Sequence, residues 1–123
     1  DITSLIYKKL GAVGFVTDGN VRDIDKIDQI KFPVFCNGEN PIDALHYWAL
    51  TEYQRSININ GVEVRPNDYS FASKDGVIIV RQEIFKEFKT IAIQQLDREN
   101  KVRDLIRNST KDFTDIEKET GRW

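Results

Sequence analysis

The segment that most restricts the fold is residues 12–36, in which two short apolar stretches flank a turn and an amphipathic stretch. Residues 12–16 predict a short buried strand, and the DGN sequence at residues 18–20 predicts a sharp turn because these residues tolerate positive φ. In DIDKIDQIKF the isoleucines recur at helical spacing, which predicts a short helix. Pro33 forces its predecessor away from helix, and residues 34–36 predict a second strand. A strand–helix–strand unit favours parallel pairing, so the expected fold class is α/β.

Helices are expected on both sides of a β-rich middle. The sequence ITSLIYKKLGA predicts a first helix that ends at Gly11. Residues 48–80 predict short, mostly antiparallel strands, with a hairpin turn at Asn60-Gly61 and a further turn at residues 74–76. After Arg81 the apolar periodicity predicts a long helix, and FTDIEKET predicts a short final one.

The composition limits the classes of function. The length of 123 residues fits one domain over residues 1–123, with a β/α core in residues 1–80 and C-terminal helices in residues 81–123. The chain has 18 Lys and Arg against 20 Asp and Glu, a net charge of −2, which argues against direct nucleic-acid binding. No apolar run is long enough to span a membrane. Cys36 is the single cysteine, which suggests a reducing cytoplasm and a small buried side chain.

Three further features guide the interpretation. The chain contains no Met and begins at Asp1, so we expect it to be the remainder of a longer protein. His46 is the single histidine, which excludes a cage of histidines around a metal and favours an ordinary core or surface role. The sequence HYWALTEY at residues 46–53 is interpreted as a strand that packs its aromatic side chains or lines a subunit contact.

The sequence GAVGFVTDGNVRDIDKIDQIKFPVF resembles the central signature of the RraA-like family. That family includes regulator of ribonuclease activity A and the class II 4-hydroxy-4-methyl-2-oxoglutarate aldolases, which are also oxaloacetate decarboxylases. The residues that match the family's pattern are Gly11, Gly14, Asp18, Gly19, Arg22, Asp23 and residues 32–35. Further on, NPIDAL departs from the pattern at Asn40, where the family has Thr, and INGVEVRPNDYSFASKDGVIIV departs at Asn67, where it has Gly.

This resemblance implies a swivelling β/β/α domain that assembles as a homotrimer or hexamer, with the site between adjacent subunits. It also implies that the N-terminal part of the domain, with further strands and a Gly-rich loop, is missing from this chain. The sequence Asp1-Ile2-Thr3 resembles the end of that loop.

The reaction that the resemblance implies is the aldol cleavage or decarboxylation of a small 2-keto acid to pyruvate, through a metal-stabilised enolate. Asp23 is the implied ligand of Mg²⁺ or Mn²⁺, since both ions prefer oxygen donors. Arg22 supplies a planar fork for the carboxylate and the enolate oxygen of the substrate. The amides of Ile2 and Thr3, at the open N-terminus of the first helix, bind the other carboxylate oxygens. By the same resemblance, Asp1 would hold a metal-bound water or act as a base.

Glu99 is the expected third carboxylate, supplied by the C-terminal helix of the neighbouring subunit. It continues the apolar helix face that runs from Phe85 to Leu96, at a spacing of about 3.6 residues, where an unpaired carboxylate is costly. The alternative is that Arg103, four residues further on, pairs with Glu99.

Simpler roles stay open for the same residues. By spacing alone, Asp23 is an ordinary helix N-cap and Asp18 an ordinary turn residue, and Arg22 beside Asp23 is a surface ion pair. The competing function is a protein-binding regulator that inhibits an RNA-degrading endonuclease without turning over a substrate, although the presence of Arg22 and Asp23 favours the enzyme. A further alternative is a truncated chain that keeps the fold without a complete site and associates through open strand edges.

Overall fold

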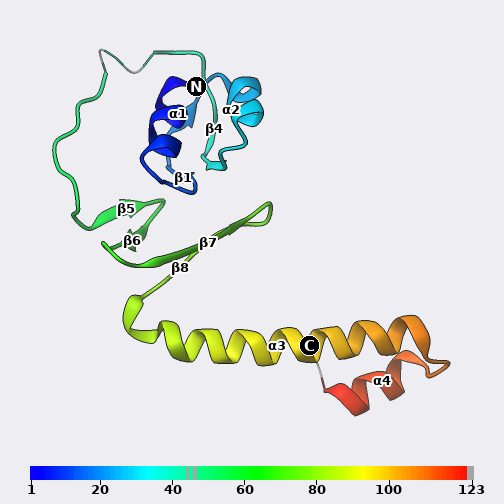
Figure 1. The fold of residues 1–123 in the computed structure, drawn as a ribbon. Helices are drawn as coiled ribbons and strands as arrows, with labels where there is room; N and C mark the ends of the chain where they lie inside the picture. Colours follow the sequence, from blue (N-terminus) through cyan, green and yellow to red (C-terminus); the bar gives the residue numbers. More distant parts are fainter. Residues whose placement is uncertain (44, 46, 122–123) are drawn as a thin grey trace. The chain divides into compact units, whose positions relative to one another are not determined.

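The computed structural model describes residues 1–43, 45 and 47–121. The chain divides into two compact units, of which the first is Asp1–Ile79 and the second begins at Val80. Figure 1 follows the chain from the first helix, in blue, to the last helix, in red.

The first unit opens with α1 (Ile2–Lys9), which ends as the sequence predicts. Gly11 follows the helix with a φ of 91°, the left-handed conformation that glycine adopts most readily. The amide of Ala12 then donates to the carbonyl of Tyr7 over 3.0 Å. The Tyr7 ring also stacks on Phe15, with 5.6 Å between ring centroids, so contacts on both sides of the turn hold the helix against the first strand.

Two parallel strand pairs carry the strand–helix–strand unit. β1 (Phe15–Val16) pairs with β3 (Val34–Phe35), and β2 (Asn20–Val21) pairs with β4 (Gly38–Glu39). Between β2 and β3 the chain forms α2 (Ile24–Ile30). The expected α/β class with parallel pairing is confirmed. The pairing of β2 with β4 was not expected, because strands of two residues are too short for periodicity to reveal.

A close approach of backbones fixes the register of β1 and β3. The amide of Phe15 donates to the carbonyl of Pro33 over 2.9 Å. A Cβ atom at Gly14 would lie 3.2 Å from the same carbonyl oxygen, which is tighter than ordinary van der Waals contact. The absence of a side chain at Gly14 therefore lets the two strands meet.

Two hairpins complete the first unit. β5 (Ile57–Ile59) pairs antiparallel with β6 (Val62–Val64) around Asn60 and Gly61, whose φ values are 49° and 85°. Positive φ at both residues is what a two-residue hairpin turn requires, so the prediction at Asn60-Gly61 is confirmed. β7 (Tyr69–Ser73) pairs with β8 (Gly76–Val80) across the turn predicted near Gly76.

The interpretation of HYWALTEY as a strand is wrong for residues 47–53, which form turns and irregular backbone. Tyr47, Trp48 and Tyr53 are 81%, 66% and 76% exposed. A strand needs a neighbour to pair with, and β-forming side chains alone do not supply one. His46 lies outside the described residues.

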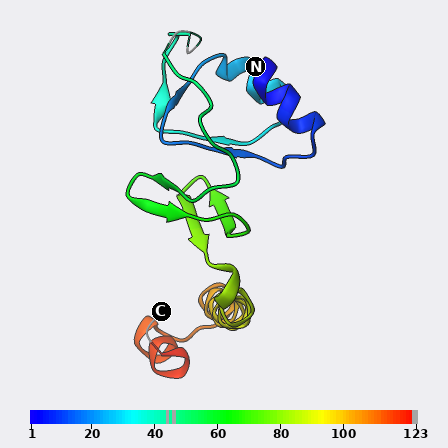
Figure 2. The ribbon, with the colours of Figure 1, turned by 90° about the vertical axis from the view of Figure 1, so that its left-hand side faces the viewer.

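The second unit is helical. A 3₁₀ turn (η1, Gln82–Ile84) leads into α3 (Phe85–Asn108), and α4 (Phe113–Thr120) packs against α3 (Figures 1 and 2). The long helix after Arg81 is confirmed, and its expected apolar face is partly covered, because Phe85 and Phe88 are half-buried. Leu96 is 53% exposed, whereas Val102 and Ile116 are 4% and 3% exposed.

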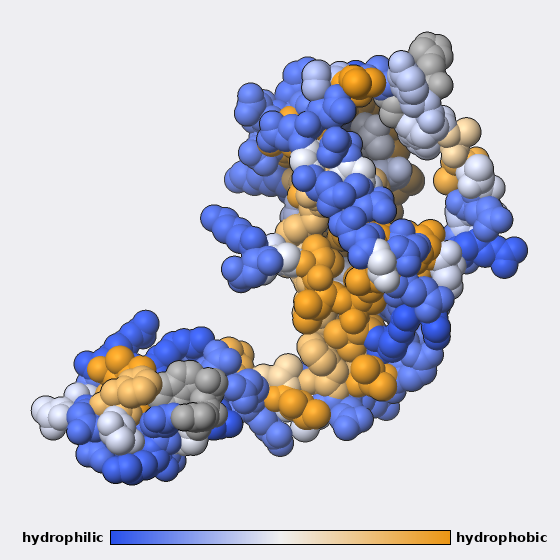
Figure 3. Space-filling view, turned by 180° about the vertical axis from the view of Figure 1, so that it is seen from behind, coloured by the Kyte–Doolittle hydropathy of each residue, from blue (hydrophilic) through white to orange (hydrophobic). Residues whose placement is uncertain are grey.

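Few side chains of the described residues are fully removed from solvent. The buried apolar residues are Ile27, Phe32, Val80, Val102 and Ile116. Apolar side chains are exposed on β5 to β8 instead, and Figure 3 shows how much apolar surface one face presents. Within the described part of the chain, no helix is both long and apolar enough to cross a bilayer.

A cavity of about 800 Å³ lies among the strands of the first unit. Its apolar lining includes Phe35, Ile59 and Ile78. Cys36 also lines it and is partly exposed rather than buried, with Sγ donating to the carbonyl of Gly38 over 3.4 Å. Cys36 is therefore not the fully buried residue that the sequence suggested.

Candidate functional site

Arg22 and Asp23 form the junction between β2 and α2. Asp23 occupies the N-cap position of α2 but makes no side-chain capping hydrogen bond, and its backbone is left-handed, with φ 62° and ψ 38°. That conformation costs most residues roughly 1–2 kcal/mol, whereas aspartate, with its short polar side chain, adopts it more readily. Asp23 is thus the N-cap by position but does not cap the helix with its side chain. Its carboxylate lies near the backbone nitrogen of Asp1 and the Arg22 guanidinium instead.

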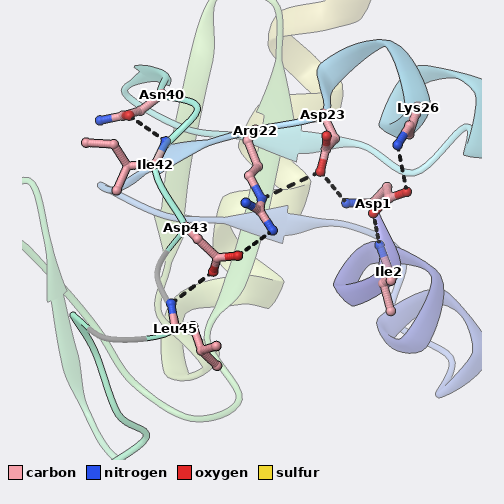
Figure 4. A network of polar contacts seen from close by, with 9 residues as sticks. All are labelled: Asp1, Ile2, Arg22, Asp23, Lys26, Asn40, Ile42, Asp43 and Leu45. Atoms are coloured by element: carbon pink, nitrogen blue, oxygen red, sulfur yellow. Dashed lines mark hydrogen bonds and ion pairs between the residues drawn. The ribbon is translucent and has the colours of Figure 1, made fainter.

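Arg22 lies between two carboxylates (Figure 4). Its Nε is 3.7 Å from Asp23 Oδ2, and its Nη2 is 2.9 Å from Asp43 Oδ2. The contact with Asp43 is a charge-assisted hydrogen bond, whereas the contact with Asp23 is too long for one. No role was predicted for Asp43, because its partner Arg22 lies in a different segment and only the fold brings the two side chains together.

Asp1 caps α1 and so changes one expectation. Asp1 Oδ1 accepts a hydrogen bond of 2.6 Å from the amide of Ile2, which occupies one of the two amides predicted to bind substrate. The Thr3 amide has no acceptor among the described residues and remains open, as expected at a helix start. Asp1 Oδ2 lies 3.6 Å from Lys26 Nζ, and the backbone nitrogen of Asp1 lies 3.7 Å from Asp23 Oδ2.

A cavity of about 240 Å³ joins these groups. It lies between the start of α1 and the junction of β2 with α2, and its lining includes Asp1, Ile2, Thr3, Arg22 and Asp23. The fold thus gathers all the predicted site residues of the first unit around one small hollow. Tyr7, Phe15 and Ile27 supply apolar walls.

Two other acidic residues of the sequence motifs make different contacts. Glu99 Oε2, on α3, pairs with Arg103 Nη2 over 2.7 Å, and the Glu99 side chain is 40% exposed. The structure therefore shows the simpler alternative, an ion pair between Glu99 and Arg103 on one helix. Asp18 does not line the smaller cavity, and its carbonyl accepts a hydrogen bond from Asn37 Nδ2 over 2.6 Å. Asp18 lies in the bend between β1 and β2, away from the residues that line this cavity.

The donor set suits a hard cation. Among the described residues, no three His, Cys, Asp or Glu side chains gather as a ready-made metal cage. Mg²⁺ does not need one, because it commonly takes one or two carboxylates and keeps several waters. Asp23, with its uncapped carboxylate, and Asp1, on the same cavity, fit that requirement.

The surroundings of Asp43 favour its ionised form. The Leu45 amide, which donates to Asp43 Oδ1 over 3.0 Å, lowers the pKa of the Asp43 carboxyl. The positive charge of Arg22 lowers that pKa further. Asp43 is therefore a carboxylate at neutral pH and a lasting counter-ion for Arg22.

The fold and site together define an α/β domain with parallel strand pairs, in which an adjacent arginine and aspartate line a small polar cavity at a strand–helix junction. A protein-family model described as RraA-like, Aldolase/RraA, matches residues 1–79. The chain belongs to the RraA-like family.

Curated relatives share this sequence over part of their length. An uncharacterized protein of Methanocaldococcus jannaschii is 34% identical over 105 residues, which are 85% of this chain and 50% of that protein. A protein of Halalkalibacterium halodurans named "Putative 4-hydroxy-4-methyl-2-oxoglutarate aldolase" is 37% identical over 73 residues, which are 59% of this chain and 34% of that protein. This chain therefore spans half or less of the length of both relatives.

Solved structures share the fold. A crystal structure of an uncharacterized protein from Pseudomonas syringae matches with a TM-score of 0.85 at 25% identity, over 90% of this chain and 56% of that one. Streptomyces coelicolor RraAS2, described as an unusual member of the RNase ES inhibitor RraA protein family, matches with a TM-score of 0.73 at 26% identity, over 83% of this chain and 52% of that one. These matches confirm the expected RraA-like α/β fold.

Proposed function

We propose that this protein is a divalent-metal-dependent lyase that cleaves or decarboxylates small 2-keto acids to pyruvate. The observation that carries the proposal is the cavity of about 240 Å³, on which Arg22 and Asp23 meet the open start of α1. The name of the Halalkalibacterium halodurans relative supports the same class of reaction. 4-Hydroxy-4-methyl-2-oxoglutarate and oxaloacetate are the substrates to test first.

Asp23 would hold Mg²⁺ or Mn²⁺ directly, which leaves Asp1 beside it to act as a base. A bound divalent ion supplies Lewis acidity toward the keto and carboxylate oxygens of the substrate. Arg22 offers a planar guanidinium for the same end of the substrate. The open Thr3 amide at the start of α1 binds a second carboxylate oxygen, favoured by the positive end of the helix dipole.

Breaking the bond between C3 and C4 leaves its electron pair on the pyruvate fragment as an enolate, which Arg22 would stabilise by charge and hydrogen bonding. A proton from solvent then adds to C3 and gives pyruvate. In an aldol substrate the C4 hydroxyl must lose its proton as this bond breaks. Asp1 is the group that we assign as base, because it lines the cavity and its Oδ2 lies near Lys26 Nζ, 3.6 Å away.

Assembly completes the proposed site. A homotrimer or hexamer would place Glu99 of a neighbouring subunit at the cavity as a third carboxylate. In that assembly Glu99 must leave or share its pairing with Arg103, which is 2.7 Å away in the single chain. Breaking the exposed ion pair between Glu99 and Arg103 costs little, about 0.3–0.5 kcal/mol.

The test is pyruvate release from oxaloacetate with Mg²⁺ and with EDTA, in the wild type and in Arg22→Ala and Asp23→Ala. Asp25→Ala is the matched control, because Asp25 is an exposed carboxylate on α2 that does not line the cavity. We expect metal-dependent release that both site variants lose and the control keeps. Release no faster than the metal-only background, from folded protein, would overturn the proposal.

The second candidate is a protein-binding regulator of an RNA-degrading endonuclease. The match to Streptomyces coelicolor RraAS2, described within an RNase ES inhibitor family, favours it. Inhibition of such a nuclease that survives Arg22→Ala and Asp23→Ala, without pyruvate release, would support this function over the lyase.

A further inference from the structure

Arg22 is held in place from outside the cavity. Arg22 lines the cavity, yet its shortest ion-pair contact among the described residues, 2.9 Å from Nη2, is with Asp43 Oδ2, and Asp43 is not among the residues that line the cavity. The contact on the cavity side, from Nε to Asp23 Oδ2, is 3.7 Å and too long for a hydrogen bond. Asp43 is therefore the partner that fixes the direction of the guanidinium.

The loop that carries Asp43 is itself fixed. It leaves β4 with the amide of Asn40 donating to the carbonyl of Val21 over 2.9 Å, directly beside Arg22. Asn40 Oδ1 then accepts from the amide of Ile42 over 2.9 Å, and Asp43 Oδ1 accepts from the amide of Leu45 over 3.0 Å. Figure 4 shows the contacts of Asn40 with Ile42 and of Asp43 with Leu45 and Arg22. One oxygen of Asp43 anchors the loop and the other faces Arg22.

We propose that Asp43 is a positioning residue for Arg22, which holds the guanidinium toward the cavity so that it meets the carboxylate of the substrate without first having to be ordered. The kinetic consequence rests on the proposed lyase function, whereas the position of Arg22 does not. Prior ordering matters because an arginine side chain loses much rotamer freedom when it is fixed.

Asp43→Asn isolates this role. The Asn oxygen still accepts from the Leu45 amide, so the loop keeps its turn, but the atom that then faces Arg22 is an NH₂ group that donates instead of accepting. Asp28→Asn is the matched control, because it removes the same charge from an exposed position on α2 away from the cavity. An Asp43→Ala variant removes both contacts of the side chain and should show the larger effect.

The first readout needs neither metal nor substrate. The rate at which phenylglyoxal modifies Arg22, followed by peptide mass spectrometry, should rise about threefold or more in Asp43→Asn, as expected for loss of a charge-assisted hydrogen bond. The second readout is kinetic. KM for the keto acid should rise about threefold to tenfold while kcat changes little, because binding is weakened before the chemical step.

A modification rate at Arg22 that is equal in Asp43→Asn and Asp28→Asn would overturn the proposal, whatever the protein catalyses. A faster modification with an unchanged KM would also overturn it, because Asp43 would then be an ordinary surface partner. If wild-type protein releases no pyruvate, the lyase fails as a function and the modification rate alone decides the position of Arg22.

Discussion

The side-chain amides of Asn37 and Asn60 bond to each other: Asn60 Nδ2 donates to Asn37 Oδ1 over 2.9 Å, and Asn37 Nδ2 lies 3.4 Å from Asn60 Oδ1. This pair joins the turn of the β5–β6 hairpin to the segment between β3 and β4. It connects two parts of the first unit that are far apart in the sequence.

Asn60→Gly should remove this link while keeping the turn, because glycine accepts the positive φ of Asn60. We expect the free energy of unfolding to fall by about 0.5–1.5 kcal/mol, the net contribution of a hydrogen bond. Asn60→Ala should cost roughly 1–2 kcal/mol more, since alanine must also adopt left-handed backbone. Urea unfolding of both variants measures the difference, and equal stabilities would show that backbone strain at this position is negligible.

Ile116 fixes α4 against α3. It is 3% exposed, and Ile116→Ala should lower the free energy of unfolding of the helical unit by about 2–4 kcal/mol through lost burial and a cavity. Ile106→Ala is the control, because Ile106 is 54% exposed and its truncation should cost well under 1 kcal/mol. Far-UV circular dichroism during urea unfolding measures both. A small loss for Ile116→Ala would show that α4 is not held by this contact.

Glu119 makes the helical unit sensitive to acid. Its hydrogen bond and ion pair with Lys111, aided by the charge of Lys101, lower the pKa of Glu119. Because the folded-state pKa lies below the unfolded one, the contribution of Glu119 to stability is complete above the unfolded pKa and is lost as the pH falls through the folded pKa. The loss should therefore begin below about pH 4.3, the ordinary glutamate value.

Glu119→Gln should reduce this dependence. Thermal melts of the wild type and the variant between neutral and acidic pH should differ most at neutral pH and converge at the acidic end. If the difference in melting temperature between the wild type and the variant stays constant down to the lowest pH, other carboxylates cause the acid sensitivity.

We expect replacement of Asp23 to change the free energy of unfolding little and to abolish metal binding. Asp23→Gly accepts the left-handed backbone, so its free energy of unfolding should stay within about 1 kcal/mol of the wild type, whereas Asp23→Ala should lose roughly 1–2 kcal/mol. Both variants should lose Mn²⁺ binding, measured by electron paramagnetic resonance. Retained Mn²⁺ affinity in Asp23→Gly would remove Asp23 from the metal site.

Local chemistry made part of this fold predictable. Pro33 and the turn-forming Asn60-Gly61 act within a few residues, so the parallel unit and the hairpin follow from them. Leu96 shows the limit: periodicity identifies an apolar helix face but not what covers it, and this side chain is 53% exposed.

The site was predictable to a similar extent. Arg22 and Asp23 are adjacent in the sequence, so the motif locates both. Asp43 reaches Arg22 only because the loop after β4 returns beside β2, which no local pattern encodes. The capping of Ile2 by Asp1 was missed for another reason, since one carboxylate can serve as a cap or as a base and the sequence does not choose between them.

The left-handed backbone at Asp23 has a consequence for how this position can change by point mutation. Aspartate codons are a single base away from those of glycine and asparagine, the two residues that adopt this conformation most easily. A point mutation can thus delete the carboxylate without a steric penalty, and a further one can restore it. Sequences of this scaffold with and without a carboxylate at this position can therefore interconvert through variants that keep the fold, which suits a family whose members carry the names of both aldolases and inhibitors.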